Sequence, residues 1–220
     1  MWFPCVVFNW SVVLEYEELM LQLILGPMFS GKTSELIRRL ERASIAGKRV
    51  VLLRPKTDTR DHLTHDDKTS KIPVHFVDRL YEIEHSEGDV IGVDEAQFFD
   101  YPAFVTEIDH LAMHCTVIAC GLNGTSERTP FAPIQSLIPL CDSIDMLTAI
   151  CTHCGSEQGT FSHYKAGDKE GDVVVGGKDT YTTLCRSCYF NIEILHGPEA
   201  KVAAEASKRA IKKMREDDDE

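Results

Sequence analysis

The residues Leu21–Leu40 read LQLILGPMFSGKTSELIRRL, and they determine the fold that we expect for this chain. An apolar run, a glycine-containing turn and apolar residues at helical spacing predict a buried strand, a loop and an amphipathic helix. Gly26, Gly31, Lys32 and Thr33 have the spacing G-x-x-x-x-G-K-[ST] of a phosphate-binding loop. The stretch predicts a nucleoside triphosphate site, but it leaves open whether water, a protein, a nucleic acid or a small molecule receives the phosphate.

The chemistry of this loop assigns roles to its residues. Backbone N–H groups at a helix N-terminus point at phosphate oxygens. Lys32 is expected to neutralise the β- and γ-phosphates, and the Thr33 hydroxyl to ligate Mg²⁺ that arrives with ATP. The phosphate-binding residues that we expect are Gly26, Pro27, Met28, Phe29, Ser30, Gly31, Lys32 and Thr33.

A second apolar run ends in acidic residues, VIGVDE, with Asp94 and Glu95 at its end. We expect Asp94 to join Thr33 in holding magnesium, which leaves Glu95 free to take a proton from the attacking group. Two solvated carboxylates at a strand end are the alternative, and the nearby phosphate-binding loop makes it the weaker one. The pair does not decide whether the nucleophile is water or a substrate hydroxyl.

Short apolar runs alternate with helical patterns through the first two thirds of the chain. A helix is expected over Thr33–Ile45, strands over 49–54, 72–77, 89–93 and 115–122, and a short helix over 79–88. Near-continuous apolar strands with intervening helices predict a mostly parallel α/β sheet of the P-loop NTPase type, flanked by helices. We divide the chain into an extension (1–20), the P-loop α/β domain (21–147), a small cysteine-bracketed subdomain (148–196) that we expect a metal to hold, and a charged tail (197–220), with a helix over 200–215.

Four of the eight cysteines form two C-x-x-C pairs, Cys151 with Cys154 and Cys185 with Cys188. Four thiolates are the tetrahedral set that Zn²⁺ prefers, and a closed Cys₄ site has a structural role. Redox pairs or core thiols are the alternative, but a redox function explains one such pair and not two. His153 lies inside the first pair and is interpreted as a surface residue, because four cysteines already satisfy the metal.

Composition restricts the classes of function. The net charge is −12, part of it in the acidic terminus EDDDE, and a general nucleic-acid binder needs a basic surface instead. The apolar N-terminus has no basic leading region and no small-residue cleavage site, and no segment has membrane-spanning length. Scattered remaining cysteines fit a reducing compartment. We therefore expect a cytoplasmic protein without nucleic-acid or membrane partners.

Taken together, these motifs resemble the thymidine kinase family of the cellular, zinc-containing type, over roughly Leu21–His196. The resemblance rests on GPMFSGKTSELIRR, KTDTR, GVDEAQFF, CGLNGT, RTPF, GGKDTY and CRSCYF, together with the paired cysteines. It implies transfer of the ATP γ-phosphate to the 5′-hydroxyl of deoxythymidine, with Glu95 as the base and Arg60 beside Lys32 near the phosphates. It also implies a homotetramer and feedback inhibition by thymidine triphosphate.

In that family the zinc-held segment is a lid whose backbone grips the thymine base. The residues that the resemblance places around the nucleoside are Met28, Phe98, Leu122, Phe131, Ser162, Val174, Gly176 and Tyr181. Two departures matter: Ser126 replaces a common aromatic residue, and the base-contacting threonine has Ser162 or Phe161 as its counterpart. We favour Ser162, because its hydroxyl keeps the hydrogen-bonding chemistry.

Three other functions compete with this one. A nucleic-acid-stimulated ATPase with a zinc-ribbon binding module is suggested by VDEAQ, which is similar to a helicase acidic motif. The short chain, the missing second motor domain and the acidic balance count against it. A GTPase switch lacks an N-K-x-D motif. A non-catalytic zinc-ribbon scaffold does not explain why Lys32, Thr33, Asp94 and Glu95 are all intact.

Overall fold

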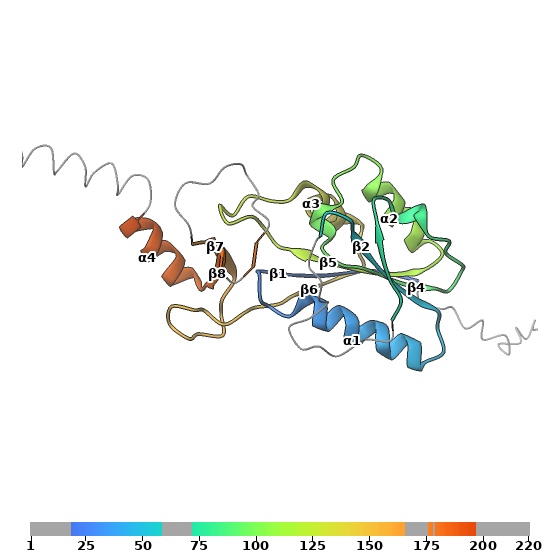
Figure 1. Ribbon diagram of the computed structural model, residues 1–220, viewed down its shortest axis with the longest axis horizontal. Coiled ribbons are helices and arrows are strands. Elements are labelled where there is room, and N and C mark those ends of the chain that lie inside the picture. The colour runs from blue at the N-terminus through green and yellow to red at the C-terminus, as the bar shows by residue number, and fades with distance from the viewer. Residues whose placement is uncertain (1–18, 59–71, 166–175, 178, 197–220) are drawn as a thin grey trace, which may run out of the picture.

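The computed structural model describes residues 19–58, 72–165, 176, 177 and 179–196. Its main feature is a six-stranded sheet in the order β3-β2-β4-β5-β1-β6, in which every neighbouring pair is parallel (Figure 1). The strands are β1 (Leu21–Gly26), β2 (Val50–Pro55), β3 (Val74–Val77), β4 (Val90–Val93), β5 (Thr116–Leu122) and β6 (Ser143–Met146). The predicted α/β class is confirmed.

Helices cover both faces of this sheet, with α1 (Lys32–Ile45) on one side and α2 (Phe104–Ala112) and α3 (Ala132–Leu137) on the other (Figure 1). The central strands β1, β2, β4 and β5 alternate between two apolar cores, as the period of two in a strand requires. On β1, Leu23 belongs to the core under α2 and α3, whereas Ile24 packs with Leu36 and Leu40 of α1. Because both faces are buried, the central strands read as the continuous apolar runs seen in the sequence.

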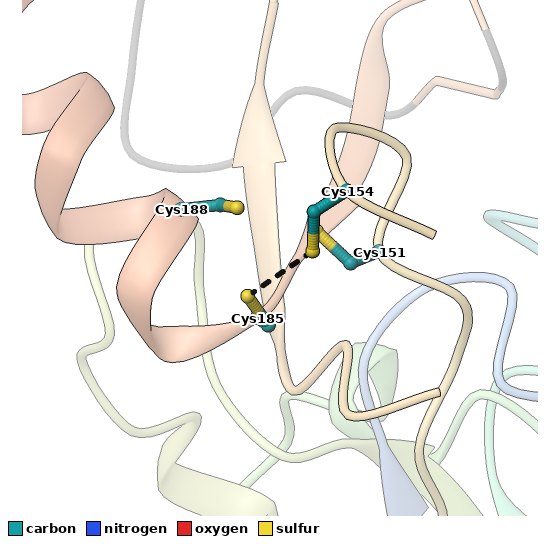
Figure 2. Close-up of side chains that lie close together, drawn as sticks. All are labelled: Cys151, Cys154, Cys185 and Cys188. Atoms are coloured by element: carbon teal, nitrogen blue, oxygen red, sulfur yellow. Dashed lines mark hydrogen bonds between the residues drawn. The ribbon is translucent and has the colours of Figure 1, made fainter. Parts of the chain in front are cut away.

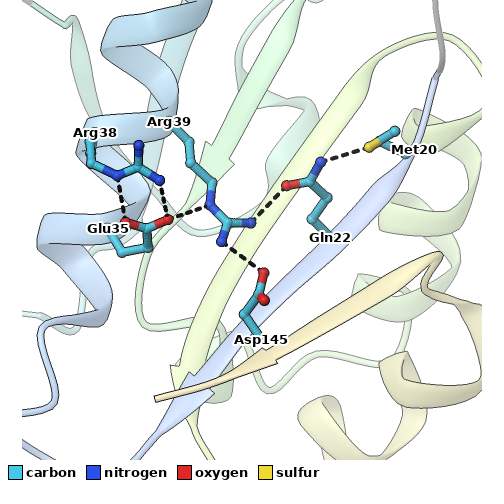
Figure 3. A network of polar contacts seen from close by, with 6 residues as sticks. All are labelled: Met20, Gln22, Glu35, Arg38, Arg39 and Asp145. Carbon is cyan, nitrogen blue, oxygen red and sulfur yellow. Dashed lines mark hydrogen bonds and ion pairs between the residues drawn. The ribbon is translucent and has the colours of Figure 1, made fainter. Parts of the chain in front are cut away.

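A polar network fastens the exposed edge strand β6 to the helix that follows the phosphate-binding loop (Figure 3). Arg39 on α1 donates to Asp145 of β6 at 2.7 Å and to the Gln22 side chain of β1 at 2.8 Å. Glu35 accepts hydrogen bonds from Arg38 and Arg39. These contacts join α1, β1 and β6 through long side chains instead of a covered apolar face.

A separate two-stranded sheet follows, made of β7 (Phe161–Tyr164) and β8 (Tyr181–Leu184), and it is followed by α4 (Arg186–His196) (Figure 1). Its small core consists of Cys151, Leu184, Cys188 and Tyr189. We call residues 148–165 and 176–196, as far as they are described, the zinc unit, after the metal that its cysteines are expected to bind.

The structure differs from the expected elements at several places. Residues 79–88 form only the 3₁₀ turn η1 (Leu80–Glu82) instead of a helix, because Ile83 has extended backbone angles. The Glu82 carboxylate accepts the N–H groups of Asp78 and Arg79, which closes this short turn. The elements that we did not predict include α2, α3, β6, η2 (Ala96–Phe98) and η3 (Ile138–Leu140).

Two further expectations concern segments at the ends of the described part. The helix expected over 200–215 and residues 1–18 of the expected extension 1–20 lie outside the described residues. Within the described part of the chain, no helix combines the length and apolar character that crossing a membrane requires.

Candidate active site

The phosphate-binding loop connects β1 to α1, and two of its side chains bond to the carbonyl oxygen of Pro27. The Lys32 ammonium donates to this oxygen at 2.7 Å and the Ser30 hydroxyl at 2.9 Å. Gly31 has a φ of 81°, a conformation that a side chain disfavours, and the helix begins at the next residue. Strand, loop and helix are therefore arranged as the motif predicts, with the loop at the N-terminus of α1.

Asp94 lies at the end of β4 and faces this loop. Its Oδ1 accepts from the Thr33 hydroxyl at 3.0 Å, from the Cys120 thiol at 2.9 Å and from the Glu95 N–H at 3.1 Å. Two oxygen groups so close together are ligands of the kind that Mg²⁺ takes, so the pair fits the metal expected to accompany ATP. Burial, together with the adjacent Asp94 carboxylate, raises the pKa of the Cys120 thiol well above its usual range.

A buried arginine on β2 balances the charge around Asp94. Arg54 is 2% exposed, forms an ion pair with Asp58, and has its Nε 3.4 Å from Oδ2 of Asp94. Its guanidinium also lies over the Phe76 ring. Because buried carboxylates need a compensating charge, Arg54 supplies one positive charge beside two buried acids, Asp58 and Asp94.

Glu95 follows directly and is itself 9% exposed. Its backbone is left-handed, with a φ of 52°, which turns the side chain away from the line of β4. The side-chain N–H₂ of Gln97 donates to the Glu95 carboxylate, and the side-chain carbonyl oxygen of Gln97 accepts a hydrogen bond from the Leu122 N–H at 3.1 Å. A Cβ at Gly121 would lie 2.8 Å from that carbonyl, so glycine makes room for the bridge.

Positive φ angles at residues other than glycine gather around this site. Among the described residues they occur at Phe29 in the phosphate-binding loop, at Glu95, and at Arg128 in the loop after β5. Such conformations cost free energy and persist where the surroundings enforce them, commonly at functional sites. The three loops that carry them meet at the carboxyl ends of the strands, where open α/β sheets bind ligands.

The four paired cysteines come together in the zinc unit (Figure 2). Their sulfur atoms lie within 4.8 Å of one another, and Cys154 and Cys185 are 3.8 Å apart. Sulfur atoms about 2.3 Å from a tetrahedral Zn²⁺ are separated by about 3.8 Å, so the set fits the ion. Burial opposes ionisation of Cys151, but N–H groups of Cys185, Cys154 and His153 lower its pKa to about 6.

The zinc unit contacts both loops that border the site. Tyr189, next to Cys188, donates its hydroxyl to the Ser126 carbonyl at 2.7 Å, and the Arg128 guanidinium covers the Tyr189 ring. From β7 and β8, the Ser162 and Thr183 side chains bond to the backbone of Met28. The zinc unit is therefore packed directly against the loop after β5 and the phosphate-binding loop.

Comparisons with known proteins agree with this geometry. The family described as thymidine kinase matches residues 19–189. The chain belongs to the thymidine kinase family. It is 40% identical over 174 residues to the cytosolic thymidine kinase of Homo sapiens. The alignment covers 77% of this chain and 73% of that protein.

Viral and bacterial members of the thymidine kinase family are similarly close. The thymidine kinase of Raccoon poxvirus is 38% identical over 181 residues, covering 78% of this chain and 97% of that protein. The thymidine kinase of Bacteroides fragilis (strain YCH46) is 39% identical over 176 residues, with coverages of 77% and 86%. The family match over residues 19–189 includes the P-loop sheet and all four paired cysteines.

The nucleoside-binding residues expected from the family resemblance are placed as follows. Leu122 ends β5, Phe98 lies in η2, and Phe131 precedes α3 and packs against the main core. Tyr181 begins β8, is 8% exposed and contacts the Tyr164 ring. Gly176 is half-buried. Their contacts with a nucleoside stay predictions.

Arg60 and Val174 lie outside the described residues. Asp58, on the same turn of sequence as Arg60, is described and is buried in the ion pair with Arg54. His153 is exposed, as expected for a residue that the metal does not need.

Sequence reasoning missed four residues that organise the site, namely Arg54, Gln97, Thr183 and Tyr189. An arginine at the end of an apolar run, RVVLLR, is the one local signal that a buried charge is needed there. Thr183 and Tyr189 have partners in distant segments, and Gln97 joins its neighbour Glu95 to the distant Leu122, so spacing alone carries no signal of these contacts. Ser126, which departs from the family pattern, is buried and receives the Tyr189 hydrogen bond at its carbonyl.

Proposed function

We propose that this chain transfers the γ-phosphate of ATP to the 5′-hydroxyl of deoxythymidine. The observation that carries the proposal is the position of Glu95 directly after Asp94, whose carboxylate bonds to both the Thr33 hydroxyl and the Glu95 N–H. A carboxylate held there can accept a proton from a hydroxyl that attacks the terminal phosphate. Family membership supports deoxythymidine as the owner of that hydroxyl.

The reaction then proceeds through residues of this chain. Loop N–H groups hold the triphosphate, and Lys32 turns from the Pro27 carbonyl towards the β- and γ-phosphates, with Arg60 proposed nearby. Magnesium held by Thr33 and Asp94 supplies charge neutralisation when bound. Glu95 removes the 5′-hydroxyl proton as the oxygen–phosphorus bond forms and the bond to the β-phosphate breaks, which releases ADP and thymidine monophosphate.

Selection of the base is assigned to the zinc unit acting as a lid. Thymine offers an N3–H donor and two carbonyl acceptors, which backbone groups near Val174, Gly176 and Tyr181 can match. A base with a different edge would leave buried polar groups unpaired. Closure over the nucleoside also excludes water, which limits wasteful hydrolysis of ATP.

The wider context is proposed on the same basis. We place the domain boundary between the sheet and the lid near residue 148, and we assign the protein to the cytoplasm as a homotetramer inhibited by thymidine triphosphate. Support for the cytoplasm comes from the cytosolic human relative. Nucleic acid is not assigned as a partner, because the net charge of −12 disfavours contact with phosphate backbones.

One experiment separates this function from a nucleic-acid-stimulated ATPase. Labelled ATP is incubated with the protein and either thymidine or single-stranded DNA, and both ADP and thymidine monophosphate are measured. We expect stoichiometric ADP and thymidine monophosphate with thymidine, no stimulation by DNA, and a loss of at least about 100-fold in Glu95→Gln. ADP release that depends on DNA and yields no nucleotide product would overturn the proposal.

A further inference from the structure

Both backbone polar groups of Met28 are bonded by side chains of the zinc unit. The Met28 N–H donates to the Ser162 hydroxyl oxygen at 3.0 Å, and the Thr183 hydroxyl donates to the Met28 carbonyl at 2.8 Å. Ser162 and Thr183 are direct cross-strand partners in the β7–β8 hairpin. Ser162 and Thr183 are 5% and 1% exposed, so both hydroxyl groups that form these bonds belong to buried residues. We call this pair the Met28 clamp.

The clamp fixes the orientation of two successive peptide planes in the phosphate-binding loop. The Met28 N–H shares a plane with the Pro27 carbonyl, which is the acceptor of the Lys32 ammonium. The Met28 carbonyl shares a plane with the Phe29 N–H, and in a trans peptide these two groups point in opposite directions. Because the carbonyl points at Thr183, the Phe29 N–H is directed away from β8.

Phe29 is also the loop residue with a φ of 64°, so its conformation needs external support. A phosphate-binding loop works only when its N–H groups already face the phosphate. Two hydrogen bonds from buried residues of the zinc unit to the preceding residue provide that support from outside the loop. The clamp thus holds the loop where the loop's own sequence does not.

Thr183 in turn is tied to both cysteine pairs. It lies two residues before Cys185, and its carbonyl accepts the N–H of Thr152, inside the first C-x-x-C turn, at 3.0 Å. The cysteine cluster therefore sets the position of the Thr183 hydroxyl relative to the P-loop sheet. Movement of the hairpin would withdraw both clamp bonds at once.

We infer that Ser162 and Thr183 are positioning residues for the phosphate-binding loop, through which the zinc-held hairpin prepares the loop to bind nucleotide. The zinc unit then acts on the phosphate donor as well as on the base. The inference rests on the proposed function only in that the loop binds nucleotide phosphates. The Ser162 hydroxyl accepts from Met28 and can still donate to a base, so its expected role at thymine is compatible with the clamp.

The test uses zinc-loaded full chain and measures binding of ADP with Mg²⁺ by calorimetry. The variants are Thr183→Val, which keeps the side-chain shape, and Ser162→Ala; Thr182→Val is the matched control. Thr182 is on the same strand, and its hydroxyl bonds to that of Thr152 instead of the loop. We expect the ADP dissociation constant to rise about tenfold in each clamp variant and to change less than about twofold in the control.

A second measurement tests, in the absence of nucleotide, whether the Ser162 hydroxyl protects the Met28 amide. Hydrogen–deuterium exchange of the Met28 amide is expected to be at least about tenfold faster in Ser162→Ala than in the control, since its buried acceptor is gone. Unchanged ADP affinity in both clamp variants, with zinc retained and the amide exposed, would overturn the inference. Zinc content and thermal unfolding of each variant identify any general loss of structure. If Ser162→Ala shows such a loss, Ser162→Thr, which keeps the hydroxyl, must bind ADP with wild-type affinity if the inference holds.

The outcomes also separate this inference from the proposed function. Failure of the wild-type chain to bind ADP would contradict the nucleotide site itself. Normal thymidine phosphorylation by wild type, combined with wild-type ADP affinity in both variants, would remove only the clamp. Weakened thymidine binding alone would assign both residues to the nucleoside pocket and would likewise refute a role in the loop.

Discussion

The side-chain amide of Gln97 donates a hydrogen bond to the carboxylate of Glu95. Because Gln97 is also bonded to the N–H of Leu122, it fixes the Glu95 carboxylate relative to the end of β5. We predict that Gln97→Met lowers kcat for thymidine phosphorylation by about 100-fold, since a misplaced base loses its alignment with the nucleophile. Michaelis constants for ATP and thymidine should change less than about threefold, because Gln97 does not hold either substrate.

Steady-state kinetics with both substrates varied provide this measurement. Gln135→Met is the control, because Gln135 is exposed on α3. A kcat within about threefold of wild type would contradict the assignment of Gln97 as a positioning residue.

Arg54 is expected to matter for stability as well as for the site. Replacing it with methionine leaves Asp58 and Asp94 buried without their cationic partner. We predict that Arg54→Met lowers the free energy of unfolding by about 3–5 kcal/mol, measured by urea denaturation at neutral pH. Arg38→Met removes the ion pair of a solvent-exposed side chain and should lower the free energy of unfolding far less. Equal effects of the two substitutions would show that Asp94 does not depend on Arg54.

The network on α1 gives a pH dependence with a defined sign. Hydrogen bonds from Arg38, and then from Arg39, lower the pKa of Glu35 from 4.5 to about 2 against the effect of partial burial. A pKa that is lower in the folded state stabilises the fold above the unfolded value, and this contribution is lost as pH falls from about 4.5 towards 2. Wild type should therefore lose stability in that window relative to Glu35→Gln.

The expected difference is below about 1 kcal/mol, because the side chains involved are partly solvated and salt screens them. Unfolding free energies of wild type and Glu35→Gln at low ionic strength, from pH 7 down to 3, measure it. Glu41→Gln, at an exposed position of the same helix, is the control. A gap between wild type and Glu35→Gln that stayed constant down to pH 3 would rule out the linkage.

Replacing a single cysteine should lower the zinc content only where that cysteine belongs to one of the two C-x-x-C pairs. Cys154→Ser is expected to reduce zinc from about one ion per chain to a small fraction, because a tetrahedral thiolate set is incomplete. The Michaelis constant for thymidine should rise at least about tenfold, because the proposed lid loses the metal that holds it together. Cys141→Ser, whose thiol donates to the Ile138 carbonyl away from the cluster, should keep the metal. Metal analysis by mass spectrometry decides, and zinc retained in Cys154→Ser would contradict the site.

The features that the sequence predicts well are local in the chain. The phosphate-binding loop, Asp94 at a strand end and the two cysteine pairs each depend on residues a few positions apart, and the structure brings them together as expected. The strands β1, β2, β4 and β5 are predicted because burial on both faces makes them uniformly apolar. In contrast, β6 is exposed and mixed in composition, so the amino-acid pattern of SIDM carries no strand signal.

The contacts that organise the site are distant in sequence and were not predictable. Gln97 with Leu122, Thr183 with Met28 and Tyr189 with Ser126 span from 25 to 155 residues. Their geometry depends on how loops dock after the sheet has formed, which hydrophobic periodicity does not encode. The failed helix at 79–88 has a local cause instead, since the Glu82 carboxylate bonds to backbone groups and favours a single turn.

The positive φ angles at Phe29, Glu95 and Arg128 have a consequence for directed evolution of this enzyme. Glycine accepts that conformation at no steric cost, so relief of backbone strain would favour glycine at all three positions. The same replacements would remove the proposed base Glu95 and the Arg128 guanidinium that covers the Tyr189 ring. Thermal tolerance and turnover should therefore trade against each other at these three sites, and libraries screened for both would retain the original residues there.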